Sequence, residues 1–476
     1  MLASKESSFG MAPSGVINGS DQSLHPTEPQ FNRSKLLRKV DLHVLPILFV
    51  IYVAAFIDRR VHRYPSKSLP QELGLTGQQP NIALTIFFVP YIVFEIPSNI
   101  LMKRLHPHIW LPGCILIFGL VMIGQGFVHS YGSLLATRFL LGLAEAGIFP
   151  GSFYLISFWY KRSEAQKRFT LYWSSTIIAG AFGSLLASAI ANLDGKRGLS
   201  SWRWVFILEG IATVLIGIIA FFCITDFPKE AKWLSEQERE FLINTVGDGT
   251  DESHKVPITT RDVAKFLVKP KNILGALMYI TILVPSYAFV FFIPTIVQGL
   301  GYGTIQTQLH SVPPFAAAFG FALVTAYLSD RLRLRLPFIL LGLALLITGL
   351  ALLISIHGTS HFSTEYAGLC LVAMGTLGIG GIIVCWYIMN LRGHVERSIG
   401  SAWFICFGNI GGIIATFSFL KKDAPYYHTG YVICISLSAL CVVVCCLYGL
   451  LIWRERKAEE HDPIMDGEAK GERLYL

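Results

Sequence analysis

Arg138-Phe-Leu-Leu-Gly-Leu-Ala-Glu-Ala-Gly-Ile-Phe-Pro-Gly151 is an apolar stretch that nevertheless carries two opposite charges. This stretch decides how the chain folds. Arg138 and Glu145 are seven residues apart. At 3.6 residues per turn, seven positions bring a helix almost back to its starting angle. Both side chains are therefore expected on one helix face, about 10 Å apart along the axis. Gly142 lies between them and leaves room for a close neighbour or a ligand.

Two interpretations of this charged pair are open. In a bilayer an ionisable side chain costs about 2.5 to 3.5 kcal/mol or more at the centre of a helix, so it usually faces a bundle interior or an aqueous cavity and marks a pathway. Arg138 and Glu145 would then line such a pathway. The structural alternative is an intramembrane ion pair that fixes how the helices pack.

Composition indicates a membrane protein with many spans. Of 476 residues, 53% are apolar and only 15% are charged, and the mean hydropathy is +0.54. Soluble proteins usually carry about a quarter charged residues. The first 40 residues are rich in Ser, Pro, Gly, Asn and Gln and lack an apolar core, so they are expected to be a disordered tail and not a signal peptide.

Apolar runs long enough to cross a bilayer predict an all-α protein with twelve transmembrane helices in two halves of six. The runs lie at 41–57, 83–101, 109–128, 133–157, 168–192, 204–225, 273–299, 308–329, 336–356, 366–390, 399–419 and 429–453. The expected parts are a disordered cytoplasmic tail at 1–40, a six-helix half at 41–225, a central cytoplasmic loop at 226–272, a second six-helix half at 273–453 and a cytoplasmic tail at 454–476. The central loop contains an amphipathic stretch at 231–242.

The basic residues orient the chain. Most of the 39 Lys and Arg residues fall in the tails and in the loops that would share one side with them, so the positive-inside rule predicts that both termini are cytoplasmic. The net charge of +8 then reflects topology, and no nucleic-acid partner is expected. All nine cysteines lie in apolar runs without CxxC pairs or Cys/His clusters, so we expect no metal site and no cofactor.

Two six-span halves joined by a cytoplasmic loop are the plan of secondary transporters. The chain also resembles the major facilitator superfamily, in particular the fungal allantoate permease branch of its anion:cation symporter group. The resemblance lies in the stretches 56–59, 81–99, 138–151, 158–162 and 202–210. In the second half, 390–394, 408–412 and 422–427 are similar to nicotinate permeases. The resemblance implies the superfamily fold and a multi-pass monomer in the plasma membrane.

The resemblance also implies roles for four charged residues. In proton-coupled carriers of this group an Asp-Arg pair in the first helix and an Arg-Glu pair in the fourth line the central site, and Asp58, Arg59, Arg138 and Glu145 match them. The guanidinium of Arg138 or Arg59 suits a carboxylate. The carboxyl groups of Glu145 and Asp58 can take up and release a proton, because desolvation favours their neutral form.

Other polar residues are weaker candidates. Glu95, in the second span, is either a further proton site or a packing partner, and Tyr91, one turn earlier, is either a substrate contact or a buried structural tyrosine. Asn390 and Asn409 are candidate cavity residues of the second half. Asp330 and Arg331 resemble the superfamily's cytoplasmic loop signature, which implies a role in the inward gate.

One stretch departs from the family pattern. After Asp58-Arg59 the family continues the first helix with mostly uncharged residues, whereas this chain has Arg60-Val-His-Arg-Tyr-Pro-Ser-Lys67. Basic groups in the outer half of a bundle are costly unless they are wet, and Pro65 would disturb a helix. Either the outer vestibule is unusually basic, which would suit anions, or the carrier is impaired.

Three classes of function were compared. A proton-coupled symporter of a small organic anion fits the two halves, the four charges and the resemblance, with a nicotinate-like monocarboxylate favoured over allantoate, biotin or pantothenate. A nutrient sensor on a transporter fold is the alternative. A membrane enzyme is disfavoured because the spans lack His/Asp clusters and nucleophile elbows.

Overall fold

The computed structural model is helical throughout the part of the chain that it describes. The described residues are 33–57, 69–160, 162–246, 265–299, 301–356, 362–391, 393–419, 423 and 427–460. Within these ranges each regular element is an α-helix or a short 3-10 helix. The predicted all-α class is therefore confirmed. Its physical cause is that a bilayer core offers no water, so a spanning backbone must satisfy its own hydrogen bonds.

The first half of the sequence forms eight α-helices before the central loop. They are α1 (Arg33–Ile57), α2 (Leu69–Glu72), α3 (Gln79–Leu105), α4 (Pro107–Gln125), α5 (Tyr131–Glu145), α6 (Ile148–Trp159), α7 (Arg162–Ile190) and α8 (Ser201–Cys223). Two 3-10 turns, η1 (Ala191–Leu193) and η2 (Lys196–Gly198), join α7 to α8.

The central loop contributes one short helix, and the second half contributes the rest. These elements are α9 (Glu236–Val246), α11 (Pro270–Gly299), α12 (Thr304–His310), α13 (Val312–Leu332), α14 (Leu336–Ser355), α15 (Phe362–Met389), α16 (Gly393–Ser418) and α17 (His428–Glu460).

The long helices match the predicted spans in order. Among the described residues, 11 stretches are long and apolar enough to cross a membrane, and they correspond to every predicted span except 83–101. That span coincides with α3, whose 27 residues extend about 40 Å. The pairs α5/α6 and α12/α13 each count as one stretch.

The fourth predicted span, 133–157, is interrupted directly after Glu145. Helix α5 ends there, and α6 begins at Ile148. Pro150 has no N–H to donate to the carbonyl of residue 146, which favours a break at that point. Gly147 allows a close approach, because a Cβ at this position would lie 2.1 Å from Ser98 Oγ. The sequence-based prediction of one continuous helix missed this turn.

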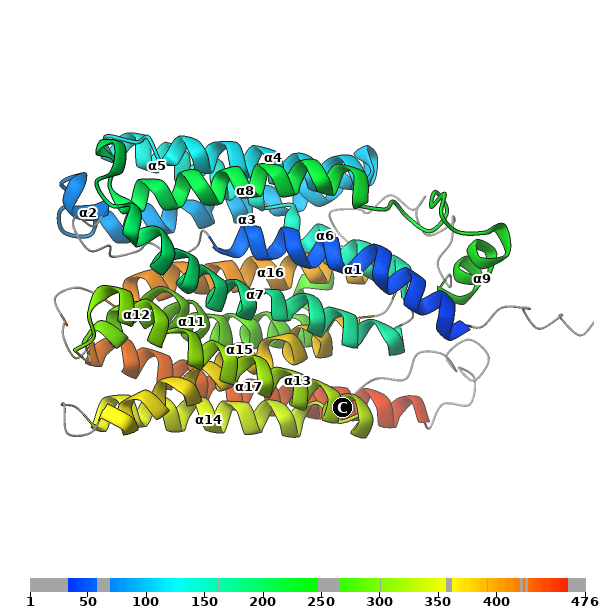
Figure 1. Ribbon diagram of the computed structural model, residues 1–476. Coiled ribbons are helices and arrows are strands. Elements are labelled where there is room, and N and C mark those ends of the chain that lie inside the picture. The colour runs from blue at the N-terminus through cyan, green and yellow to red at the C-terminus, as the bar shows by residue number, and fades with distance from the viewer. Residues whose placement is uncertain are drawn as a thin grey trace, which may run out of the picture.

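The helices pack as two groups that meet along shared faces (Figure 1). In the first group α4 packs on α8, α3 on α5, and α1 on α7 and α8. In the second group α14 packs on α15 and α17, and α11 packs on α16. The groups meet where α7 contacts α13 and α15 and where α3 contacts α16. The start of α1 and the end of α17 lie at the same end of the bundle as α9 (Figure 1).

Charged contacts gather at the α9 end. Arg168 donates from Nε and Nη2 to the two carboxylate oxygens of Asp41, at 2.8 Å each. Lys39 of α1 donates to Glu238 of α9 at 2.8 Å. Trp233, just before α9, stacks on both His43 and Trp159, with ring centroids 4.2 and 5.4 Å apart. These contacts attach the amphipathic part of the central loop to the first group of helices.

The α3–α5 contact provides a test of this packing. A Cβ at Gly142 would lie 2.0 Å from the carbonyl oxygen of Phe87. We expect Gly142→Ala to destabilise the protein by about 1–3 kcal/mol, because the two backbones must move apart. Thermal unfolding of the purified protein in detergent measures this loss.

Gly113→Ala in α4 is the matched control, since a Cβ there meets nothing within 4 Å. Equal melting temperatures for the two variants would contradict the α3–α5 packing.

Candidate functional site

A small cavity lies between the two groups of helices. Helices α1, α3, α6 and α7 line one side of it, and α11, α15 and α16 line the other side. Its lining residues are Tyr52, Phe56, Tyr91, Phe149, Trp173, Thr176, Tyr279, Leu283, Ser286, Tyr287, Val290, Leu377, Ile405 and Asn409. The cavity volume of about 30 Å³ leaves room for one or two water-sized groups. The helices must therefore move apart before a larger molecule can enter.

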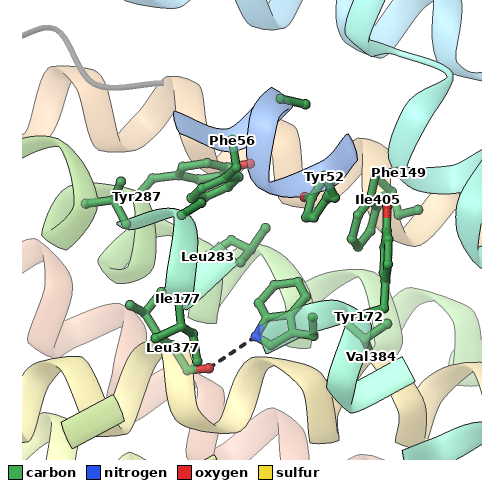
Figure 2. Packing of buried hydrophobic residues seen from close by; sticks show 14 of the residues in the cluster. Tyr52, Phe56, Phe149, Tyr172, Ile177, Leu283, Tyr287, Leu377, Val384 and Ile405 are labelled. Carbon is green, nitrogen blue, oxygen red and sulfur yellow. Dashed lines mark hydrogen bonds between the residues drawn. The ribbon is translucent and has the colours of Figure 1, made fainter. Parts of the chain in front are cut away.

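Aromatic residues make up half of the cavity lining. Tyr52 stacks on Tyr172 and tilts against Phe149, each with ring centroids 5.0 Å apart. Tyr287 of the second group meets Phe88 of the first group edge to face at 5.4 Å. Figure 2 shows Tyr52 and Phe149 close together, with Tyr172 beside them. Such walls favour flat, polarisable ligands, because rings gain from stacked and edge-on contacts beyond their buried area.

The wall also contains a hydrogen bond between the two groups. Trp173 Nε1 of α7 donates to the carbonyl oxygen of Leu377 of α15 at 3.1 Å, and this is the dashed line in Figure 2. Two glycines make the approach possible. A Cβ at Gly380 would lie 2.4 Å from Trp173 Cζ2, and one at Gly381 would lie 3.2 Å from the same ring.

Two of the predicted site residues, Tyr91 and Asn409, line this cavity. Asn409 Oδ1 accepts a hydrogen bond from Tyr287 Oη at 3.3 Å. Both residues are almost completely buried. The structure thus brings one predicted residue from each half to the same cavity.

Glu95 lies directly behind the cavity, one helical turn after Tyr91. Its side chain is 0% exposed. Glu95 Oε2 accepts a hydrogen bond from the Cys406 thiol of α16 at 3.4 Å, and the Asn409 side chain lies within hydrogen-bonding range of the same carboxyl. The carboxyl of one half therefore contacts two side chains of the other half.

Arg138 and Glu145 are both buried on α5, but neither lines the cavity. Arg138 faces a separate small pocket beside α2, formed with Leu69, Pro70, Leu75, Pro80, Ala83 and Leu134. Its guanidinium lies over the Phe206 ring, 5.5 Å from the centroid. Glu145 lies close enough to Tyr172 to interact with it electrostatically. Tyr172 in turn stacks on Tyr52, which lines the cavity.

The remaining predicted residues lie elsewhere. Asn390 is at the end of α15 and donates from Nδ2 to the carbonyl oxygen of Trp386 at 2.9 Å, away from the cavity lining. Asp330 pairs with Arg335 at 3.1 Å, whereas Arg331 is exposed. Asp58, Arg59 and the atypical segment 60–67 fall outside the described residues.

Apart from Tyr91, sequence reasoning missed the aromatic residues that make up half of the cavity lining. Tyr52, Trp173, Tyr279 and Tyr287 carry no charge and belong to apolar runs like those that face lipid. Their only signal in the sequence is that they are aromatic and lie in the middle of a span, and exposed positions such as Phe182 and Tyr327 share that signal.

A second missed cluster lies at the α2 end of the bundle. The Glu72 carboxylate accepts hydrogen bonds from Ser200 Oγ, from Trp202 Nε1 at 2.6 Å and from Arg203 Nε at 2.9 Å. Arg203 Nη1 also donates to the carbonyl oxygen of Gly126 at 3.0 Å. Partial burial opposes ionisation of Glu72, but these donors and the Arg203 charge outweigh it and lower the pKa of Glu72 below its ordinary value. The cluster ties α2 to the start of α8.

One group of side chains could hold a metal ion. His106, Asp226 and Glu230 at the α9 end each offer a ligand atom, and these atoms lie within 4.8 Å of one another. His106 Nδ1 is 3.1 Å from Glu230 Oε2, and His108 Nδ1 is 2.6 Å from Asp226 Oδ2. The imidazoles and carboxylates therefore already satisfy one another, and the cluster lies far from the aromatic cavity along α3.

Comparison with known proteins places the fold in a large transporter family. A model described as Major Facilitator Superfamily matches residues 48–416. The MFS transporter prlL of a fungal species is 30% identical over 420 residues, which cover 86% of this chain and 84% of that protein. The MFS-type transporter cnsO of Penicillium expansum is 29% identical over 444 residues, 90% of this chain and 85% of the relative.

A solved structure supports the same fold. A bacterial homologue of the human lysosomal transporter Spinster, in an inward-facing and unoccupied conformation, superposes with a TM-score of 0.63. The match covers 86% of this chain and 96% of that chain, at 16% sequence identity. At this identity the likeness concerns the fold alone.

The Glu72 cluster has a testable pH dependence. We expect Glu72→Gln to lower the free energy of unfolding on the order of 1 kcal/mol at neutral pH, because charge-assisted hydrogen bonds are lost at a partly exposed site. Since the folded-state pKa is depressed, the wild-type advantage is fully present above the ordinary value of 4.5 and disappears as the pH falls through the folded-state pKa. Thermal unfolding at a series of pH values measures this difference.

Glu240→Gln serves as the control, because Glu240 is exposed on α9. A Glu72→Gln deficit that stays constant down to the lowest pH at which the protein is folded would contradict the charge-based account.

Proposed function

Because the chain belongs to the Major Facilitator Superfamily, whose members are membrane transporters, we propose that it is a proton-coupled symporter of a small organic anion. The proposed substrate is a nicotinate-like monocarboxylate, with allantoate, biotin and pantothenate as the other candidates. The two groups of helices would expose the cavity between them alternately to the two sides of the membrane. We further propose that the protein lies in the plasma membrane with both termini in the cytoplasm.

The observation that carries this proposal is the aromatic cavity between the two halves. A flat heteroaromatic ring can stack against Tyr52 or Trp173, and the amide of Asn409 can donate a hydrogen bond to a carboxylate. The narrowness of the cavity fits a closed state of the cycle, in which the halves touch through Trp173 and Leu377. A small planar acid is a better fit to these walls than a sugar, which needs many polar partners.

The described cavity lining contains no charged residue. We therefore propose that arginines outside this lining attract the anionic substrate. In this proposal Arg138, beside α2, attracts the anion as it approaches from that end. Arg59, which lies outside the described residues, is the other candidate to attract the anion. Both keep their charge at any physiological pH, so the attraction does not depend on protonation.

Coupling requires a carboxyl group that responds to the anion. Glu145 is buried and interacts electrostatically with Tyr172, which stacks on the cavity residue Tyr52. An anion in the cavity would favour the protonated form of Glu145, because two negative charges in a medium of low polarity repel strongly. Substrate and proton would then bind together. Asp58 and Glu95 are the other candidate proton carriers.

The central test is paired transport in proteoliposomes with labelled nicotinate. The wild-type protein should accumulate nicotinate when the outside is made acidic. Glu145→Gln imitates the protonated group and cannot release a proton. We expect this variant to exchange nicotinate in counterflow at a rate similar to wild type but to lose gradient-driven accumulation.

Other outcomes separate the competing functions. Binding without accumulation by the wild type would favour a sensor or an impaired carrier. Accumulation of uncharged sugars or amides in preference to acids would rule out the anion proposal. If accumulation by Glu145→Gln remains at the wild-type level, Glu145 is not the coupling group.

The two asparagines provide a matched test of the binding site. Asn409 lines the cavity, whereas Asn390 bonds to Trp386 within its own helix. We expect Asn409→Ala to weaken nicotinate binding roughly tenfold, since one hydrogen bond to an anion is lost. Asn390→Ala should leave affinity unchanged. Equilibrium binding to the purified variants measures both, and equal losses of affinity would argue against the cavity as the binding site.

A further inference from the structure

The contact between α3 and α16 joins the two halves along an antiparallel seam. At one end Thr85 Oγ1 and Thr416 Oγ1 are 2.9 Å apart. Midway, Gly412 packs against Phe88, where a Cβ would lie 2.5 Å from the ring. At the other end the Cys406 thiol donates to Glu95 Oε2 at 3.4 Å. We refer to these three contacts together as the α3–α16 seam.

Glu95 is the residue of the seam whose burial in the ionised form costs the most free energy. Its carboxyl is fully buried, and among the described residues Glu95 Oε1 has no hydrogen-bond partner. A buried carboxylate with one unsatisfied oxygen and no opposite charge is strongly disfavoured, whereas the neutral acid is tolerated. The Cys406 thiol also lies 3.9 Å from the carbonyl oxygen of Ile92, so it keeps an acceptor when Glu95 is protonated.

The seam is connected to the cavity through Asn409. This residue lies one turn after Cys406 on α16, lines the cavity and accepts from Tyr287 through Oδ1. Among the described residues its Nδ2 has no hydrogen bond of normal geometry, although the side chain lies beside the Glu95 carboxyl. One amide thus contacts both the substrate cavity and the buried acid.

The other titratable groups near α3 are directed elsewhere. The helices packed on α3 are α4, α5, α6 and α16. On α5, Arg138 faces the pocket beside α2, and Glu145 faces Tyr172. On α4, His108 pairs with Asp226 at the α9 end. Among the side chains that the structure describes, the remaining titratable groups on these elements are Cys114 of α4, Tyr131 of α5, Tyr154 of α6, Cys406 of α16, Glu396 of α16, which pairs with Lys269, and, on α3 itself, Tyr91 and Arg104.

We propose that Glu95 is a proton site assembled from both halves, and that a proton on Glu95 is required for the α3–α16 seam to close. The proposal rests on the proposed symport function, and it assigns Glu95 as the binding site of one of the transported protons. While the seam is open, the carboxylate is wet and takes a proton from the accessible side. The neutral acid is buried when the seam closes, and the proton is released when the seam opens again. A bound anion would affect the protonation of Glu95 through Asn409, which contacts both the cavity and the Glu95 carboxyl.

The first measurement needs no substrate. Hydrogen–deuterium exchange of α3 and α16 in the purified full-length protein reports seam opening, and variants are compared at the same pH so that intrinsic exchange cancels. At low pH, wild type and Glu95→Gln should be equally protected. At high pH the wild-type seam should exchange roughly tenfold faster than that of Glu95→Gln, because only the wild type carries a buried charge. Glu240→Gln is the control, because Glu240 is exposed on α9, and it should follow the wild type.

Cys406 is a positioning residue, and its variants keep the proposal testable if Glu95→Gln fails to fold. Cys406→Ala removes the thiol donor from the ionised carboxylate. The seam should then exchange several-fold faster than wild type at high pH and at the wild-type rate at low pH. Cys406→Ser restores a donor and should return the high-pH rate to the wild-type level. A purely structural role for Cys406 would change the rate equally at both pH values.

The same variants separate this proposal from the proposed function. Wild-type and Glu95→Gln seams that exchange equally at every pH would overturn the assignment of Glu95, whatever the transport result. A wild-type protein that fails to accumulate nicotinate in an acid-outside gradient, yet has a seam controlled by Glu95, would refute nicotinate symport and leave the proton-controlled seam standing.

Discussion

The absence of hydrogen-bonding solvent in the bilayer is the constraint on which this structure depends. A buried polar group is stabilised by a partner within the protein, and many hydroxyl groups of the spans find one by bonding back to their own helices. Thr176 donates to the carbonyl oxygen of Trp173 at 2.8 Å, and Thr281 donates to that of Leu277 at 2.7 Å. Ion pairs such as Arg168–Asp41 lie at the ends of the bundle. A charge that remains deep inside is therefore informative.

The same constraint shapes the boundary between the halves. If the halves separate as proposed, each direct hydrogen bond between them must be broken and replaced by one to water, so a boundary with few such bonds separates more easily. Here it consists mainly of aromatic rings packed against glycines, as where Trp173 meets Gly380 and Phe88 meets Gly412. The few polar contacts, such as Trp173 with Leu377, lie next to the cavity. Contacts of this kind can separate and re-form without a large cost.

Charge and recognition are divided between two layers of the protein. Rings and neutral polar groups form the cavity wall, while Glu145 lies behind Tyr172 and Glu95 lies behind Tyr91 and Asn409. A buried carboxyl that does not touch the ligand can still respond to its charge, because fields are weakly screened in a medium of low polarity. In the proposed function the wall would determine which molecule fits, and the carboxyl groups behind it would determine when the halves move.

The sequence by itself determined the helical class, the order of the spans and the burial of Arg138, Glu145 and Glu95, because hydropathy acts locally and a long apolar run has few alternatives to a helix. It identified Tyr91, Asn409 and Glu95 as polar residues inside spans, but it could not separate them from Asn390, which bonds within its own helix. Only the tertiary structure decided that Arg138 faces α2, that Asp330 pairs with Arg335 and that Glu95 meets Cys406. Which face of a helix meets which neighbour depends on packing between residues up to several hundred positions apart, as Thr85 and Thr416 are, and no local pattern in the sequence encodes that pairing.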